Sequence, residues 1–494
     1  MKNQTVREPS TLLSFVPIIV LVCLLAVTIQ IYGNDALSGG SQIVLLIASA
    51  VCCLIAIAYC KVKWEVIEEA ISKNIADLSP AILILLIIGA LSGAWMISGI
   101  VPTLIYYGMG IIHPSYYLVS TCIICAVVSV IIGSSWTTIA TVGVALLGVG
   151  QALGFSPGWI GGAIISGAYF GDKVSPLSDT TVLSSSITGT PLFTHIRYLM
   201  ITTIPTMLIT LVIFTIVGFT YDAASTDQIS TFTVVLKEKF VISPWLLIVP
   251  AVTLFLIIKR VPAIITLFLS AIAAGIVALI AQPHILQEIA GSDTSGVLAQ
   301  FKGVLTSFYG STAIDTGNAE LNELVSTRGM SGMLNTIWLI ICAMVFGGMM
   351  VASGMLMKIV TVFIRFMRNT FSVVTSTVAT GIFLNLTTAD QYISIILTGN
   401  MFKGVYKRKG YESRLLSRTI EGSVTVTSPL VPWNTCGMTQ SMIMGISTFV
   451  YLPYCFFNLL SPIVNIIVAA LGYKIYKVKP EEEVEVDKPK AEKS

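Results

Sequence analysis

Windows of about 20 consecutive apolar residues recur along the whole chain, and this is the length that an α-helix needs to cross the hydrocarbon core of a bilayer. Of the 494 residues, 55% are hydrophobic and only 11% are charged. The alternating pattern that a membrane β-barrel requires is absent from the sequence. The sequence therefore predicts an all-α polytopic membrane protein.

The positive charges predict an orientation. If the N-terminus is cytoplasmic, most of the 28 Lys and Arg residues fall in cytoplasmic loops or tails. Lys237, Lys239, Lys302 and Arg328 are the exceptions in outside loops. Since Lys and Arg collect on the cytoplasmic side of a membrane, we expect both termini in the cytoplasm. The apolar run 11–32 is too long for the core of a signal peptide and is interpreted as the first span.

The two halves of the chain resemble each other at three places, in the same order. The matched stretches are 93–99 with 348–354, 134–138 with 387–391, and 175–177 with 428–430. Each half holds seven apolar segments, and because seven is odd the second half must enter the membrane from the opposite side. The sequence therefore predicts two inverted-topology repeats, with an ion or substrate site at discontinuous helices near the midplane.

This pattern divides the chain into consecutive parts. The predicted parts are a cytoplasmic N-terminus (1–10), a first transmembrane repeat (11–220), an external linker (221–243), a second inverted repeat (244–473) with an external loop (282–332), and a charged cytoplasmic tail (474–494).

Two stretches interrupt the apolar segments with proline. GDKVSPLSDTT begins at Gly171, and Pro176 within it cannot continue a helix, so an unwound stretch between two half-helices is expected. SPLVPWNTCG, from Ser428, is its counterpart in the second half. Unwound backbone at membrane depth must be buried in protein or line a wet cavity, where its carbonyl and hydroxyl groups can act as ligands.

Two polar clusters, GSSWTT from Gly133 and LTTADQ from Leu386, each separate two short apolar segments. Segments 115–150 and 371–402 can therefore be re-entrant hairpins with polar tips or pairs of thin spans. We favour hairpins, because a tip that meets an unwound break would give one oxygen-lined site in each half.

Only four acidic residues fall within the predicted spans, namely Asp172, Asp179, Asp390 and Glu421. A charge in the bilayer costs about 3 kcal/mol or more, so each needs a partner or a function in proton and cation coupling. Structural alternatives remain open for each. Asp172 can pair with Lys173, Asp179 can cap a helix, Asp390 can face water near a loop, and Glu421 can pair with Arg418.

The tips and breaks together predict two sets of hard oxygen ligands for a cation. The first set is Ser134, Ser135, Thr138, Asp179 and Thr180, and the second is Thr387, Thr388, Asp390, Asn434 and Thr435. A proton and a sodium ion would compete for the carboxylates, and occupancy by either would permit a conformational switch. No phosphate-binding loop, nucleophile–base pair or nucleic-acid signature occurs, which argues against an enzyme and against a resident cofactor.

The GDKVSPLSDTT string, with GSSW upstream and TADQ and SPLVPWN downstream, resembles the NhaC-type sodium/proton antiporters over roughly residues 10 to 475. The resemblance implies a bacterial or archaeal inner-membrane protein that binds Na⁺ near Asp179, with Ser134, Ser135 and Thr180. It allows a homodimer. The family includes a branch that exchanges malate for lactate, so a sodium- and proton-coupled exchanger of small carboxylates is the alternative function, with Lys173 as the candidate substrate anchor.

Overall fold

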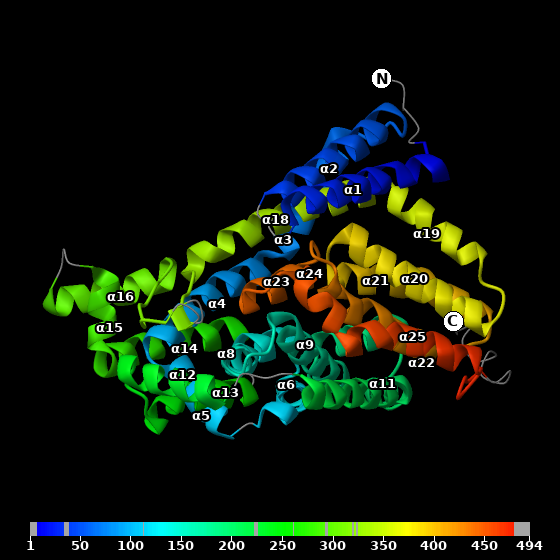
Figure 1. Ribbon diagram of the computed structural model, residues 1–494. Helices are drawn as coiled ribbons and strands as arrows, with labels where there is room; N and C mark the ends of the chain where they lie inside the picture. Colours follow the sequence, from blue (N-terminus) through cyan, green and yellow to red (C-terminus); the bar gives the residue numbers. More distant parts are fainter. Residues whose placement is uncertain are drawn as a thin grey trace, which may run out of the picture.

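The computed structural model describes residues 7–33, 39–111, 113–221, 226–259, 261–291, 295–318, 321–322 and 325–478. Most of the predicted N-terminal segment 1–10 and of the tail 474–494 lies outside these residues. Within them the regular structure is helical (Figure 1). Among the described residues, eight helices are long and apolar enough to cross a membrane, or up to 11 if each sharply bent pair counts as one span. The chain is a multi-pass membrane protein.

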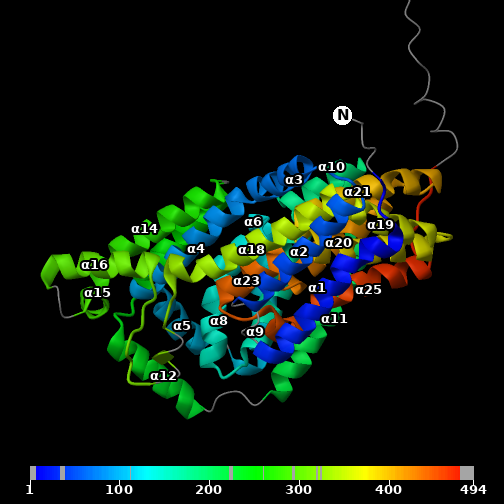
Figure 2. The ribbon, with the colours of Figure 1, turned by 90° about the horizontal axis from the view of Figure 1, so that it is seen from above.

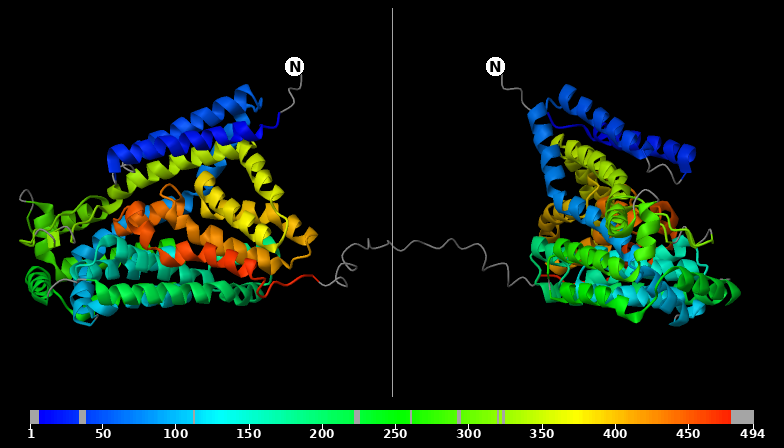
Figure 3. Two further views of the ribbon diagram at one scale, coloured as in Figure 1. Left: turned by 45° about the vertical axis from the view of Figure 1, so that its right-hand side comes forward. Right: turned by 90° about the vertical axis from the view of Figure 1, so that its left-hand side faces the viewer.

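The helices form layers. In Figures 1 and 3 the C-terminal helices lie between a layer built on α1, α2 and α18 and a layer built on α6 and α11. The first layer and its neighbours are α1 (Thr11–Tyr32), α2 (Gly40–Ala58), α3 (Trp64–Asp77), α4 (Ser79–Ile97), α18 (Gly329–Ala352) and α19 (Met355–Arg365). The opposite layer is α6 (Tyr117–Ile132), α8 (Val144–Ala152), α9 (Pro157–Val174) and α11 (Leu192–Thr220). The helices of the C-terminal part are α20 (Thr370–Thr388), α21 (Gln391–Arg408), α22 (Ser413–Ile420), α23 (Thr435–Met444), α24 (Thr448–Tyr451) and α25 (Phe456–Ala470).

The remaining helices gather mainly at one end of the molecule, seen from above in Figure 2. They are α5 (Ile100–Ile111), α12 (Thr226–Lys239), α13 (Ile248–Ile258), α14 (Ala263–Ala281), α15 (Pro283–Ala290) and α16 (Gly296–Tyr309). Two short helices, α7 (Ser135–Thr138) and α10 (Asp179–Thr188), begin next to the first polar tip and the first proline break. The segments predicted as an external linker and an external loop therefore contain helices α12, α15 and α16.

The first matched pair of stretches has the same local structure in both halves. Ser98 and Ser353 end their helices, and each side-chain hydroxyl donates to the carbonyl three residues earlier, both at 3.1 Å. The following residues, Gly99 and Gly354, have φ values of 78° and 71°, which favour glycine. Helices α4 and α5 are bent by 67° at this break.

The two polar tips also share one backbone arrangement. A left-handed residue, Gly133 (φ 73°) or Ala389 (φ 56°), ends the incoming helix. The next residue, Ser134 or Asp390, caps the outgoing helix by accepting a backbone N–H bond. Structure thus pairs Ser134 with Asp390, three positions away from the sequence-based pairing with Thr387, because caps rather than threonine pairs define a helix start.

The proline breaks follow the same register. The second half-helices, α10 and α23, are each 10 residues long, and each ends at a left-handed glycine. Their caps are Ser178 and Asn434. These two residues are separated along the chain by the same number of positions as Ser134 and Asp390, so one constant offset relates tip and break in the two halves.

Short helices explain why fewer spans are found than the seven segments per half that hydropathy suggested. Helices α10, α22 and α23 are only 8 to 10 residues long, too short to cross a bilayer alone. On the two sides of the first tip, 114–132 and 135–152 each have the length and hydropathy of a span. The re-entrant hairpins therefore stay a prediction.

Helices α6 and α9 pack closely because α9 presents glycine to α6. A Cβ added at Gly167 would lie 2.1 Å from the carbonyl oxygen of Cys122, and one at Gly171 would lie 2.3 Å from that of Ala126. Small residues at helix interfaces permit this approach in membrane proteins. The contact fixes the end of α9, where the first proline break begins.

We expect Gly167→Ala to lower the melting temperature of the detergent-purified protein, because the added methyl group forces two backbones apart at a cost of about 1–3 kcal/mol. Melting followed by size-exclusion chromatography measures the effect. The matched control is Gly110→Ala, where an added Cβ meets nothing within 4 Å. Equal melting of the two variants would contradict the proposed packing role.

Candidate cation site

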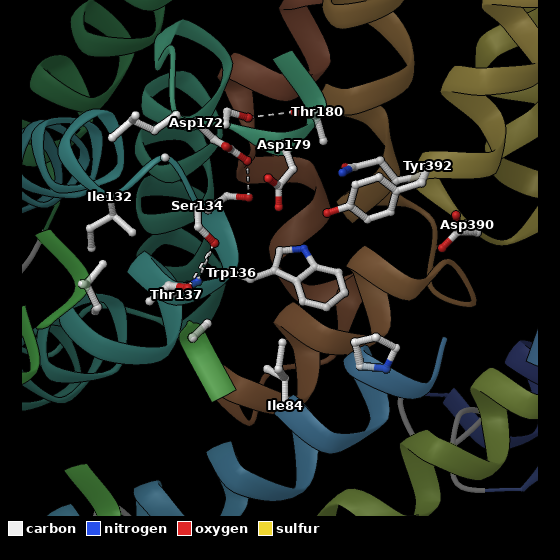
Figure 4. A pocket seen from close by; sticks show the side chains of 18 of the residues that line it. Ile84, Ile132, Ser134, Trp136, Thr137, Asp172, Asp179, Thr180, Asp390 and Tyr392 are labelled. Carbon is white, nitrogen blue, oxygen red and sulfur yellow. Dashed lines mark hydrogen bonds between the residues drawn. The ribbon is translucent and has the colours of Figure 1, made fainter. Parts of the chain in front are cut away.

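The polar tips of the two halves and the first proline break meet at one cavity of about 870 Å³ (Figure 4). Six of the residues predicted from sequence line it, namely Ser134, Ser135, Asp172, Asp179, Thr180 and Asp390. Apolar side chains from α4, α13, α14 and α21 form most of the remaining wall, including Ile84, Ile88, Ile257, Leu267 and Ile396. The chain thus brings both polar tips and the first proline break to a common space.

Asp172 connects the first break to the first tip. The hydroxyl of Ser135 donates to the Asp172 carboxylate over 2.8 Å, and both side chains are buried. In the second half the hydroxyl of Ser428 donates to the amide oxygen of Gln391 over 2.7 Å. With the constant offset, Ser135 corresponds to Gln391 and Asp172 to Ser428. Both halves therefore have a bond between tip and break, but the donor lies on the tip in the first half and on the break in the second.

Asp179 is the most accessible carboxylate of the site. It is the first residue of α10, after the cap Ser178, and its side chain is exposed to the cavity. Among the described residues no hydrogen-bond partner of its carboxylate is found. Figure 4 shows it directed toward the space between Trp136 and Tyr392. A free carboxylate at a helix N-terminus is stabilised by the helix dipole and remains available to a cation.

Both carboxylate oxygens of Asp390 accept hydrogen bonds. One carboxylate oxygen accepts the backbone N–H of Ile393 over 2.9 Å and caps α21. The other accepts the hydroxyl of Thr435 over 3.2 Å, which joins the second tip to the second half-helix. The side chain is buried and lines the cavity wall. The alternative that Asp390 faces water near a loop is therefore wrong.

The remaining predicted ligands do not line the cavity. They are Thr138 of the first set and Thr387, Thr388, Asn434 and Thr435 of the second. Thr138, Thr387 and Thr388 each donate to the carbonyl of the residue four positions earlier, at 2.9 Å. This back-bonding satisfies hydroxyl groups inside helices. Asn434 caps α23 and also donates to the carbonyl of Asn385 over 3.1 Å. These residues hold the backbone of the tips and breaks.

Lys173 and Glu421 are buried outside the cavity lining. The ammonium group of Lys173 donates to Ser461 over 3.0 Å and lies 5.6 Å from the centre of the Phe457 ring. Glu421 accepts a bond from Ser184 over 2.8 Å. Within the described part of the chain, the ion pairs closer than 4.0 Å are Lys239–Glu288, Lys358–Glu8 and Arg414–Glu412. The suggested pairs Asp172–Lys173 and Glu421–Arg418 are therefore not direct contacts.

Sequence reasoning missed three residues that line the cavity, namely Trp136, Gln391 and Tyr392. All three lie inside or next to the tip motifs GSSWTT and LTTADQ. Their position next to a cap was the available signal. An aromatic or amide side chain among apolar residues does not by itself indicate a site.

A family model described as the Na⁺/H⁺ antiporter family matches residues 5–187 and 167–473. The chain belongs to this family. It is 35% identical over 407 residues to the Na⁺/H⁺ antiporter NhaC of Bacillus subtilis, covering 82% of this chain and 87% of the relative. It is also 35% identical to the malate-2H⁺/Na⁺-lactate antiporter of that organism, covering 84% and 86%. Among solved structures, the Alcanivorax borkumensis YdaH transporter aligns over 93% of this chain and 99% of its own, at 12% identity and a TM-score of 0.39.

We expect Asp390→Asn to retain the melting temperature, because asparagine caps a helix as well as aspartate does. Asp390→Ala should lose about 1 kcal/mol of stability, since the N–H of Ile393 then has no cap. Melting of the two purified variants in detergent measures the difference. Equal destabilisation would show that the negative charge, and not the cap, stabilises this tip.

Proposed function

We propose that the protein exchanges Na⁺ for H⁺ across the bacterial inner membrane by alternating access, with Asp179 and Asp172 as the carboxylates for which the two ions compete. In this proposal the halves are inverted repeats, the tips are re-entrant hairpins, and both termini are cytoplasmic. The observation that carries it is the meeting of both carboxylates with the first tip at one cavity wall. Membership of the Na⁺/H⁺ antiporter family supports it.

Sodium prefers hard oxygen ligands, and the wall supplies them from two elements. The tip contributes the Ser134 and Ser135 hydroxyls, and the start of α10 contributes Asp179 and Thr180. Thr180 is held by a 3.0 Å hydrogen bond to Ser178. Because the ligands come from separate elements, a bound ion would draw the tip and the break together, which couples occupancy to conformation.

Competition follows from the cost of burying charge. An empty site leaves carboxylates charged in a partly desolvated space, whereas a proton or a sodium ion neutralises them. Movement of the loaded site across the membrane is then less costly than movement of the empty one. Alternate loading with Na⁺ on one side and H⁺ on the other gives exchange without a nucleotide.

A second candidate, exchange of small carboxylates coupled to Na⁺ and H⁺, is favoured by the similarity to the malate-2H⁺/Na⁺-lactate antiporter. It needs a cationic anchor for the anion. The in-membrane candidate, Lys173, lies outside the cavity lining in this conformation and is bonded to Ser461. Uptake of labelled malate and lactate into proteoliposomes, with and without a Na⁺ gradient, separates the two functions.

We expect Asp179→Asn to abolish Na⁺-driven proton flux in proteoliposomes, at least 100-fold below wild type, because asparagine cannot bind a proton and lacks the charge that attracts the cation. A pH-sensitive dye trapped in the vesicles measures the flux. Asp315→Asn, at an exposed position between α16 and α18, is the matched control and should keep wild-type flux. Undiminished exchange by Asp179→Asn would remove this residue from the mechanism.

We expect Ser135→Ala to raise the Na⁺ concentration for half-maximal flux by about tenfold. Loss of a hydrogen bond to a charged group costs about 1.5–3 kcal/mol. The charged form of Asp172, for which Na⁺ competes with a proton, therefore becomes less favourable. Ser186→Ala, on the exposed face of α10, makes the same chemical change outside the cavity. A rise of equal size in both variants would mean that the effect is not due to Asp172.

A further inference from the structure

The cavity is much larger than a sodium site. At about 870 Å³ it lies in the range of about 300–1,000 Å³ that is typical of pockets for organic ligands. A sodium ion and its ligands at Asp179 would occupy one corner. The remaining space is bounded by side chains of α4, α13, α14 and α21.

The charged residues of the cavity lining favour a ligand of one sign of charge. Among the described residues that line the cavity, the ionisable ones at neutral pH are Asp172, Asp179 and Asp390, and none is Lys, Arg or His. Asp172 and Asp390 already accept bonds from Ser135 and Thr435. Asp179 is therefore the carboxylate that is open to a ligand, and the ligand it favours is a cation.

Two aromatic side chains lie next to this carboxylate. Trp136 comes from α7 and Tyr392 from α21, and Figure 4 shows both rings next to Asp179. Aromatic faces attract organic cations, and pairs of such rings with a carboxylate are the usual receptor for alkylated ammonium groups. A hydrated sodium ion gains little from these rings, whereas an ammonium ion with alkyl groups gains from rings, charge and the apolar wall together.

Gln391 adds a hydrogen-bond donor that the protein does not use. Its side chain is only 3% exposed, and its amide oxygen accepts from Ser428 over 2.7 Å and from the thiol of Cys436 over 3.2 Å. These two bonds fix the amide. Its nitrogen makes no hydrogen bond within the described part of the chain and is not one of the fully buried polar atoms that lack a partner. The cavity wall thus offers a donor to an oxygen atom of a ligand.

We propose that this cavity binds a small organic ammonium ion, with its charge at Asp179 and its alkyl groups between Trp136 and Tyr392, in competition with Na⁺. The proposal rests on the proposed function in one respect, namely that Asp179 is the cation site. An oxygen atom two or three bonds from the charged nitrogen would accept from Gln391. The three carboxylates disfavour organic anions of the same size, so the ammonium site and the second candidate function predict opposite ligands for this cavity.

Choline is a suitable probe because its charge is permanent, so it does not carry protons across the vesicle membrane. Two molecules of similar shape serve as controls: neutral 3,3-dimethylbutan-1-ol and anionic 3,3-dimethylbutane-1-sulfonate, which also carries no protons across the membrane. Choline should raise the Na⁺ concentration for half-maximal flux without lowering the maximal flux. Neither control should do so. Binding of radiolabelled choline to the purified protein, displaced by Na⁺, gives a second readout that does not depend on exchange.

Two substitutions test the ring contacts. We expect Trp136→Leu and Tyr392→Leu each to weaken choline binding by about tenfold, because leucine keeps the apolar volume and removes the π face. The Na⁺ dependence of flux should change by less than twofold. Trp338→Leu, at a side chain of α18 that is 43% exposed and outside the cavity lining, is the matched control and should leave both values unchanged.

The outcomes separate this proposal from the function on which it rests. Intact Na⁺/H⁺ exchange with no choline binding would overturn the ammonium site and leave the antiporter. Choline binding without Na⁺/H⁺ exchange would overturn the proposed antiport and leave the ammonium site. Equal inhibition by choline and by 3,3-dimethylbutan-1-ol would also overturn the proposal, since the cavity would then bind apolar volume rather than charge.

Discussion

The structure depends on a side-chain hydrogen bond that joins a tip to a proline break, once in each half. Ser135 donates to Asp172 over 2.8 Å, and Ser428 donates to Gln391 over 2.7 Å. A second bond of the same kind lies next to each: Ser129 donates to the carbonyl of Ala168, and Asn385 to that of Val424, both at 2.7 Å. Unwound backbone at membrane depth is tolerated only where protein groups or cavity water satisfy it. These bonds tie each tip to the segment that carries the proline break, and both tips and the first break line the cavity that a cation can enter.

The two halves share positions but exchange their chemistry. Where the first half has a serine on the tip and a carboxylate on the break, the second half has an amide on the tip and a serine on the break. The next pair shows the same exchange: Ser134 corresponds to Asp390, and Asp179 to Thr435. The acidic group thus lies on the break in one half and on the tip in the other. The second half uses its aspartate to cap α21 and to bind Thr435, which leaves Asp179 as the accessible carboxylate.

The sequence allowed much of this arrangement to be predicted, and the failures have physical causes. A helical membrane protein follows from hydropathy, and the breaks follow from Pro176 and its counterpart, because proline cannot continue a helix. The inverted repeat itself stays a prediction. The sequence-based alignment of the two tips differs by three positions from the structural one, since sequence similarity matched Ser134 with Thr387, whereas a left-handed residue followed by a cap defines each tip. The pair Asp172–Lys173 does not form because consecutive helical residues point to different sides. Trp136 and Tyr392 were missed because their position next to a cap was the available signal, and nothing in one sequence shows which aromatic rings will share a cavity.

The crowding of carboxylates gives a reason why exchange, rather than simple binding, suits this site. Asp172, Asp179 and Asp390 line one cavity, and the buried cationic side chains Lys173 and Arg418 lie outside its lining. Like charges in a partly desolvated space raise each other's free energy, so neutralisation of the set by a proton or by a cation lowers it. In the proposed exchange an entering cation takes the place of a proton, so the binding of one ion and the release of the other follow from the same electrostatics. The two rings beside Asp179 would then add affinity for organic cations over Na⁺.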